Sequence, residues 1–134
     1  MSNNELKSEV LSAIVKGQGF HNYMAAECHG LNQHWWHDPA TGEKKERNKG
    51  EQLMLIVSEV AEAMEGERKD LMDTHLPHRK MVEVELADVF IRLYDYIGAY
   101  GYDIDGAIAE KLVYNAHRAD HKPEARLAAN GKKW

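Results

Sequence analysis

Apolar residues recur at helical spacing along almost every patterned stretch of this sequence, and this periodicity limits the fold more than any other feature. In the first stretch Leu6, Val10 and Ile14 follow the i, i+4, i+8 pattern of one helix face. No alternation of the β type is present in the sequence. The pattern therefore predicts an all-α fold, a helical bundle of four to five helices. The expected helices cover residues 4–16, 20–29, 49–69, 79–99, and a last stretch from Asp103 or Asp105 to about His121.

One segment between the expected helices is unusually long. Residues 30–49 contain Gly, Pro, Asp and Asn without any period, so they are expected to form a loop. At about 20 residues it is longer than a compact domain usually tolerates without a functional role. Asn48 followed by Glu51 resembles a capping box that opens the next helix. The length of 134 residues suits a single domain spanning residues 1–134.

Composition excludes several classes of protein. Apolar residues make up 43% of the chain and charged residues 29%, as in an ordinary soluble globular protein. The net charge of −5 argues against nucleic acid as the main partner. No apolar run reaches the roughly 18 residues of a membrane span, and "MSNNELKSEV" is too polar for a secretory signal. Cys28 is the only cysteine, which excludes an internal disulfide and fits the cytoplasm.

Two pairs of carboxylates interrupt apolar helical stretches. Glu59 and Glu62 lie three positions apart on one expected helix, and Glu85 and Asp88 repeat that spacing on the next. Residues three apart share a helix face, so each helix presents an acidic pair from a largely apolar context. The opposite faces of these two helices are expected to form the core through Leu53, Ile56, Val57, Val60, Met64, Val82, Leu86, Val89, Leu93 and Ile97.

Four carboxylates brought together repel one another and lose hydration, so a cation is expected among them. Mg²⁺ suits such a site because it prefers oxygen ligands and also binds phosphates. The alternative is solvated acidic faces with local ion pairs, in which Arg92 pairs with Asp88 or Asp95. A di-iron carboxylate site is disfavoured because neither Glu59 nor Glu85 is followed by His at the third position.

The last expected helix carries a stripe of three polar side chains, Lys111, Asn115 and Arg118, at i, i+4 and i+7. Lys and Arg bind phosphate oxygens, and Asn adds neutral hydrogen bonds. The alternative is that cations near the end of a helix interact with its dipole and its last carbonyls. Together with the acidic pairs, the stripe favours recognition of a phosphate bridged by a cation.

These motifs, in this order, resemble the MazG-type all-α nucleoside triphosphate pyrophosphohydrolases. The resemblance consists of Ser58-Glu59-x-x-Glu62, 22 intervening residues, Glu85-x-x-Asp88, and Lys111-x-x-x-Asn115-x-x-Arg118. The phrases "GEQLMLIVSEVAEAMEGERKD" and "KLVYNAHRADH" are similar to those of small, single-domain members from phages and mobile elements. The likeness covers about residues 20–134. Ser58 is a departure, since the family's first motif often begins with two adjacent acids.

The resemblance implies hydrolysis of a nucleoside triphosphate, with deoxynucleotides the favoured substrates, to a monophosphate and pyrophosphate, in nucleotide-pool cleaning or phage metabolism. It implies Mg²⁺, with Mn²⁺ as a possible substitute, and a homo-oligomer, either a dimer or a tetramer. A carboxylate not fully used by the metal would take the proton of the attacking water, and Glu59 and Glu62 are the two candidates. The implied metal ligands are Glu59, Glu62, Glu85 and Asp88, and the residues implied to face the triphosphate are Lys111, Asn115 and Arg118.

The long loop contains two adjacent tryptophans, Trp35 and Trp36. A nucleotide base stacks on an indole with a gain of roughly 1–3 kcal/mol. We expect at least one Trp to bind the base, with a slight preference for Trp36; His21, His34 and His37 could add hydrogen bonds. In the alternative, one Trp plugs the end of the bundle. Two rival functions stay open: a dUTPase-like all-α hydrolase, and a non-catalytic helical oligomerisation or regulatory module.

Overall fold

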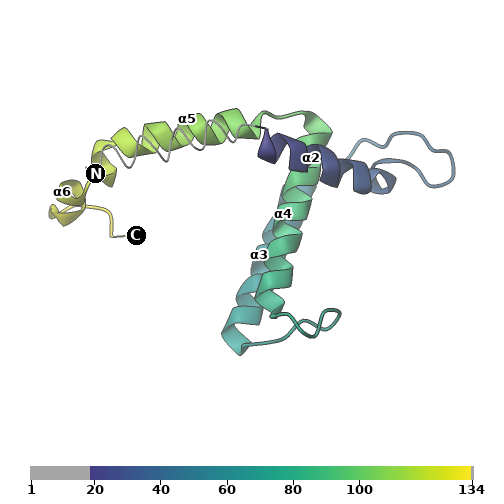
Figure 1. Cartoon of the computed structure of the whole chain (residues 1–134), viewed down its shortest axis with the longest axis horizontal. Coiled ribbons are helices and arrows are strands. Elements are labelled where there is room, and N and C mark those ends of the chain that lie inside the picture. The colour runs from purple at the N-terminus through teal and green to yellow at the C-terminus, as the bar shows by residue number, and fades with distance from the viewer. Residues whose placement is uncertain (1–18, 134) are drawn as a thin grey trace. The chain divides into compact units, whose positions relative to one another are not determined.

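A computed structural model describes residues 19–133, and all regular secondary structure in this range is helical (Figure 1). The prediction of an all-α fold is confirmed. The expected helix over residues 4–16 lies outside the described residues. The described helices are α2 (Phe20–Leu31), the 3₁₀ helix η1 (Gln33–Trp36), α3 (Lys49–Lys69), α4 (Met81–Tyr100), α5 (Ile104–His117), the 3₁₀ helix η2 (Ala119–His121) and α6 (Pro123–Leu127).

The chain divides into two compact units, and each is described here by itself. One consists of residues 21–102 and contains α3 and α4, while the other includes residues 103–134 with α5 and α6. The single domain over residues 1–134 therefore stays a prediction. None of the helices within residues 19–133 has the length and continuous apolarity that crossing a membrane requires.

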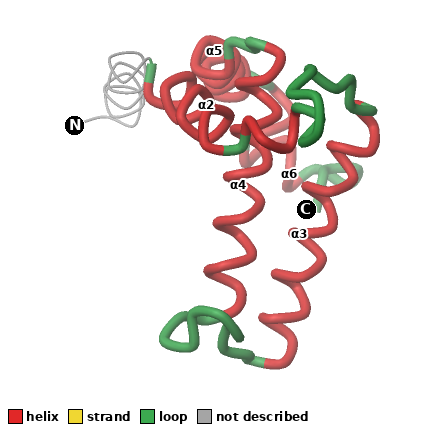
Figure 2. Tube along the Cα trace, turned by 90° about the vertical axis from the view of Figure 1, so that its right-hand side faces the viewer, coloured by secondary structure: helices red, strands yellow, loops and turns green. Residues whose placement is uncertain are grey.

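Helices α3 and α4 form an antiparallel hairpin that carries both acidic pairs (Figure 2). The side chain of Asn48 accepts a hydrogen bond from the backbone N–H of Glu51 at 3.0 Å, so the predicted cap opens α3. The helix ends at Lys69, and its C-cap residue Asp70 has a left-handed φ of 48°. In the connection, the buried carboxylate of Asp73 accepts hydrogen bonds from the backbone N–H groups of His75 and Leu76. These contacts turn the chain so that α4 returns along α3.

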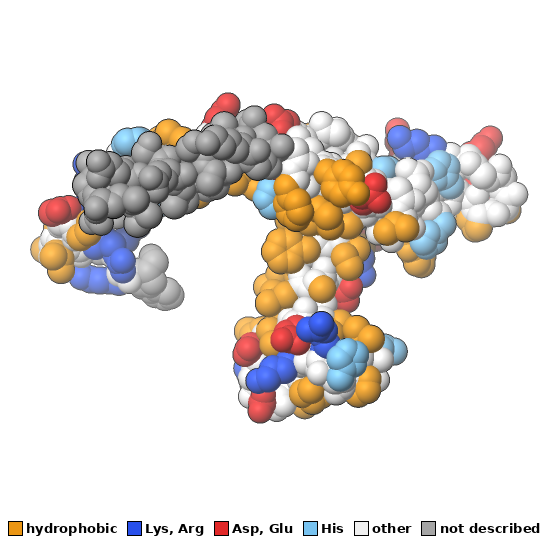
Figure 3. Space-filling view, in the orientation of Figure 1, with side chains coloured by type: hydrophobic (Ala, Val, Ile, Leu, Met, Phe, Trp, Pro, Cys, Tyr) orange, Lys and Arg blue, Asp and Glu red, His pale blue; other side chains and the backbone are white. Residues whose placement is uncertain are grey.

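The predicted core stripe of the hairpin is only partly buried. Ile97 is 3% exposed, as expected for the core. On α3, however, the expectation is wrong for the single chain, where the stripe is about half exposed and Ala63 and Gly66 are the buried positions instead. Small residues are buried there because α4 approaches closely: a Cβ on Gly66 would lie 3.0 Å from the Cβ of Met81. Exposed members of the predicted stripes are Leu53, Val57, Val60, Met64 and Leu86. Figure 3 shows exposed hydrophobic side chains, in orange, over the hairpin.

Helix α2 packs against the last turns of α4 at a glycine. A Cβ at Gly98 would overlap the carbonyl oxygen of Ala25 and approach the Cβ of His29 to 2.8 Å. The backbone of α2 cannot yield as a flexible side chain would. The two helices are therefore in direct backbone contact at this point.

We expect Gly98→Ala to lower the free energy of unfolding by about 1–3 kcal/mol, because the added methyl group must push α2 away from α4. Urea denaturation followed by circular dichroism measures the change. Gly30→Ala is the matched control: a Cβ at Gly30, within α2, meets no atom within 4 Å, so this variant should be neutral or more stable. Equal stabilities of the two variants would contradict the close approach of α2 to α4 at Gly98.

The second unit follows the sequence prediction at its start and departs from it at its end. The side chain of Asp103 accepts a hydrogen bond from the backbone N–H of Gly106 at 3.0 Å and caps α5. The helix ends at His117, before the expected end near His121. The tail, which lacks a sequence pattern, forms η2 and then α6, where Pro123 occupies the first turn as its fixed φ favours.

Candidate functional site

Three of the four predicted metal ligands meet between α3 and α4. One carboxylate oxygen from each of Glu59, Glu85 and Asp88 lies within 4.8 Å of the others. All three side chains are half-buried. Glu62 lies one turn further along α3, is exposed, and is outside this group. The spacing on each helix and the antiparallel pairing of the hairpin thus produce a cluster of three carboxylates, which we call the acidic triad.

The acidic triad is electrostatically strained without a cation. Burial raises the pKa of Glu85 above its usual range, and a hydrogen bond with Glu59 and the charges of Glu59, Asp88 and Glu62 raise it further. Burial and the charge of Glu59 likewise raise the pKa of Asp88, while Arg92 acts in the opposite direction. The ionised forms of Glu85 and Asp88 are therefore disfavoured in the folded chain. A set of crowded oxygen donors of this kind fits a hard divalent cation such as Mg²⁺.

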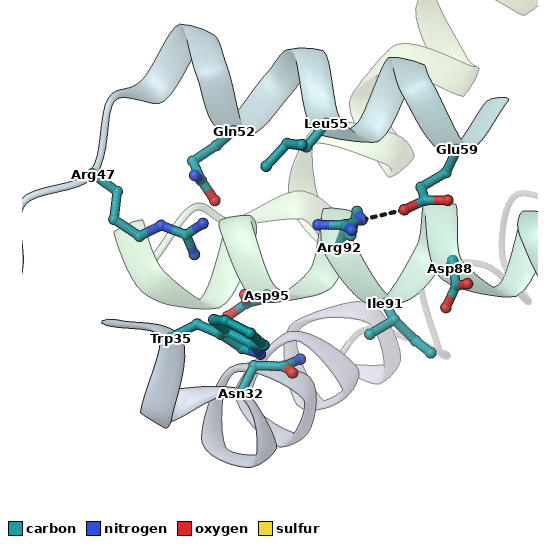
Figure 4. A pocket seen from close by; sticks show the side chains of 10 residues that line it. All are labelled: Asn32, Trp35, Arg47, Gln52, Leu55, Glu59, Asp88, Ile91, Arg92 and Asp95. Atoms are coloured by element: carbon teal, nitrogen blue, oxygen red, sulfur yellow. Dashed lines mark hydrogen bonds and ion pairs between the residues drawn. The ribbon is translucent and has the colours of Figure 1, made fainter. Parts of the chain in front are cut away.

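Arg92 forms an ion pair across the hairpin. Its Nε donates a hydrogen bond of 2.6 Å to Oε1 of Glu59, which belongs to the triad (dashed line in Figure 4). The sequence had suggested Asp88 or Asp95 as partners of Arg92 on its own helix. The ion pair of Arg92 in the described residues is instead with the neighbouring helix.

A cavity of about 420 Å³ adjoins the acidic triad. Two members of the triad, Glu59 and Asp88, line it, and Trp35 lines its other end (Figure 4). The remaining lining residues are Asn32, Arg47, Gln52, Leu55, Ile91, Arg92 and Asp95. The cavity therefore offers carboxylates at one end, two guanidinium groups, two side-chain amides and an indole.

The two tryptophans have different environments. Trp36 is 3% exposed, and its indole N–H donates to both carboxylate oxygens of Asp95, at 3.0 and 3.1 Å. Trp35 is 59% exposed and lines the cavity beside the triad. Trp36 instead lines a separate cavity with Lys44, Lys45, Arg47 and Lys49. Of the two indoles, Trp35 is thus the one available to a ligand beside the triad.

The histidines predicted to assist base binding do not line the cavity beside the triad, as far as the described residues show. A ring nitrogen of His21 shares a hydrogen bond of 2.7 Å with the hydroxyl of Tyr94. His37 is hydrogen-bonded through Nδ1 to the carbonyl oxygen of Gln33 at 2.8 Å. His34 lies beside Trp35, with ring centroids 5.0 Å apart.

The predicted phosphate-binding residues belong to the other unit of the chain. Lys111 and Arg118 lie over the ring of Tyr114, with their charged groups 4.8 and 5.7 Å from its centroid. Arg118 follows the end of α5 and holds Asp120 through two hydrogen bonds, of 2.9 and 2.6 Å. That pairing holds the pKa of Asp120 well below its usual range. Within the described residues, Oδ1 of Asn115 is buried and has no hydrogen-bond partner.

Sequence reasoning missed most of the residues that line the cavity. Asn32, Arg47 and Gln52 carried no motif, because their role depends on how the loop and α2 meet the hairpin. Arg92 and Asp95 were marked only as partners of a local ion pair on their own helix. The pairing of Arg92 with Glu59 could not be predicted from sequence spacing, because it joins two different helices.

Comparison with protein families, with curated proteins and with solved structures finds no match to this chain.

Proposed function

We propose that this protein is a Mg²⁺-dependent nucleotide pyrophosphohydrolase that cleaves a nucleoside triphosphate to a monophosphate and pyrophosphate. The observation that carries the proposal is the meeting of Glu59, Glu85 and Asp88 beside a cavity that ends at Trp35. Metal-ligating carboxylates for a polyphosphate and an indole for a base are the two halves of a nucleotide site. The MazG-type resemblance of the motifs supports the same activity.

The triad supplies the metal ligands in this proposal. Glu59, Glu85 and Asp88 would hold Mg²⁺, or Mn²⁺ in its place, and the bound ion would neutralise phosphate charge and activate water for attack. Glu62 is exposed on the next turn of α3 and outside the triad. It is thus the carboxylate left to accept a proton from the attacking water, although Glu59 is the other candidate.

The residues that line the cavity beside the triad supply the proposed contacts to the base. Trp35 would stack on the base, and the amides of Asn32 and Gln52, which line the same cavity, would hydrogen-bond its edge. Lys111, Asn115 and Arg118 contribute to triphosphate binding by analogy with the family. Deoxynucleoside triphosphates are the proposed substrates, in nucleotide-pool cleaning.

Assembly is the further part of the proposal. The exposed apolar side chains Leu53, Val57 and Val60 of α3 form one stripe, which a second copy of the chain would cover. A dimer or tetramer is therefore proposed. The cytoplasm is the proposed location, because Cys28, the one cysteine of the chain, is a free thiol.

Release of pyrophosphate from a panel of ribo- and deoxynucleoside triphosphates, with Mg²⁺ and with EDTA, tests the activity. We expect turnover that requires Mg²⁺ and is lost with EDTA. Turnover confined to dUTP would favour the dUTPase-like rival. A folded protein that hydrolyses no nucleotide would favour a non-catalytic helical module and reject the proposal.

A further inference from the structure

The ion pair between Arg92 and Glu59 places a cation on a carboxylate that the proposed metal site needs. Nε of Arg92 lies 2.6 Å from Oε1 of Glu59. Charge compensation explains the contact, since Glu59 is crowded by Glu85 and Asp88 and Arg92 partly offsets that crowding.

The guanidinium of Arg92 has unused hydrogen-bonding capacity. Within the described residues, Nε alone has a protein acceptor, which leaves the two terminal amino groups without one. Arg92 lines the cavity beside the triad (Figure 4). Planar guanidinium groups with free donors are well suited to bind phosphate oxygens in pairs.

The side chains of Glu59 and Arg92 differ in how far they are exposed, and therefore in how easily each can change its conformation. The side chain of Glu59 is 14% exposed and that of Arg92 is 43% exposed. Arg92 can therefore leave the pair by rotation of its side chain, with no movement of the backbone. A divalent cation beside Glu59 would repel the guanidinium, so metal and Arg92 compete for this carboxylate.

We infer that Arg92 is an exchanging residue: it neutralises Glu59 while the metal site is empty, and it passes to a phosphate group of the substrate when a divalent cation binds the triad. This inference rests on the proposed function. It assigns to one side chain two successive anionic partners in the same cavity. Metal binding thereby releases a phosphate-binding group, so the two ligands bind in a favoured order, with metal first.

The inference predicts opposite effects of Arg92→Gln on the two ligands. Mn²⁺ should bind about two- to fivefold more tightly, because a partly exposed competing ion pair is lost. Inorganic pyrophosphate, added at saturating Mn²⁺, should bind about tenfold or more weakly, because charge-assisted hydrogen bonds are lost. Isothermal titration of Mn²⁺ and then of pyrophosphate measures both, with circular dichroism to check the fold.

Two controls separate exchange from a structural role. Arg92→Lys keeps the positive charge but loses the paired N–H donors of the guanidinium. Metal affinity should therefore stay near that of the wild type, while pyrophosphate affinity falls. Arg79→Gln removes a cation from an exposed pair with Glu83, 3.7 Å apart, and should change neither affinity. Weaker or unchanged Mn²⁺ binding in a folded Arg92→Gln protein overturns the exchange. If the opposite shifts occur but the wild type hydrolyses no nucleotide, the exchange stands and the proposed hydrolase activity fails.

Discussion

Replacing Asp88 by asparagine is expected to lower Mg²⁺-dependent nucleotide hydrolysis by about 100- to 1000-fold, the range for losing one group that organises charge stabilisation in the transition state. Asp88 is one of three carboxylates whose oxygens lie within 4.8 Å of one another. An amide keeps the shape of the side chain but is a weak ligand for Mg²⁺. Initial rates over a range of Mg²⁺ concentrations measure the effect, and the loss should persist at saturating metal.

The same variant should be more stable than wild type when metal is absent. Burial and the charge of Glu59 raise the pKa of Asp88, so its ionised form costs stability in the folded chain. Asparagine removes that cost. Thermal unfolding in EDTA should therefore give a higher Tm for Asp88→Asn, while in excess Mg²⁺ the wild type should gain stability and the variant should gain less. A variant that is inactive and less stable in EDTA would indicate a structural role for Asp88.

The sign of the pH dependence follows from the raised pKa values of Glu85 and Asp88. A carboxyl group whose folded-state pKa is raised contributes stability at low pH, and this contribution is lost as the pH rises through that pKa. In EDTA, the stability of wild type relative to Asp88→Asn should therefore fall as the pH rises above about 4, the usual pKa of an aspartate side chain. A relative stability that rises over this window would mean that the triad is not crowded in solution.

Helix limits were largely predictable because their signals are local. Asn48 and Asp103 cap α3 and α5 through the backbone N–H group three residues on, a contact that sequence spacing alone specifies. The expected helix over residues 49–69 coincides with α3. Each acidic pair was predictable for the same reason, since i and i+3 share a helix face whatever surrounds the helix.

Contacts between elements were not predictable in this way. The i+4 spacing of Asp88 and Arg92 suggested a pair within one helix, whereas Arg92 reaches Glu59 on another. Periodicity also marked Val57 and Val60 as core, but they are exposed in the single chain, because periodicity identifies an apolar face and not what covers it.

The choice between Trp35 and Trp36 shows the same limit. Both lie in the 3₁₀ helix η1, where successive side chains point about 120° apart, so one faces inward when the other faces out. Which of them is buried depends on the position of Asp95 on α4, the acceptor for the indole of Trp36. The residues next to Trp36 in the sequence therefore do not indicate that Asp95 is its partner.

The second large effect is expected at Asp95, which joins three elements of the unit formed by residues 21–102. Its carboxylate is 9% exposed and accepts from the indole N–H of Trp36 in η1. It also lies 2.8 Å from Nδ1 of His29 in α2, and because an ionised carboxylate only accepts hydrogen bonds, that nitrogen carries the hydrogen. The ring of Trp36 packs edge-on against His29 and Tyr100. Asp95 therefore fixes the position of η1, which contains Trp35.

Asp95→Leu should lower the free energy of unfolding by about 3 kcal/mol or more, because a buried indole N–H and a partly buried imidazole N–H lose a charged acceptor. Asp95→Asn keeps one acceptor for the indole and should lose about half as much. Glu83→Gln, at an exposed position of α4, should stay within about 0.5 kcal/mol of wild type. Urea denaturation measures the free energies of unfolding of the three variants and so tests this order of stability. Because Trp35 adjoins Trp36 in η1, Asp95→Asn should also raise the KM for nucleotides. An unchanged KM with lowered stability would argue against base binding by Trp35.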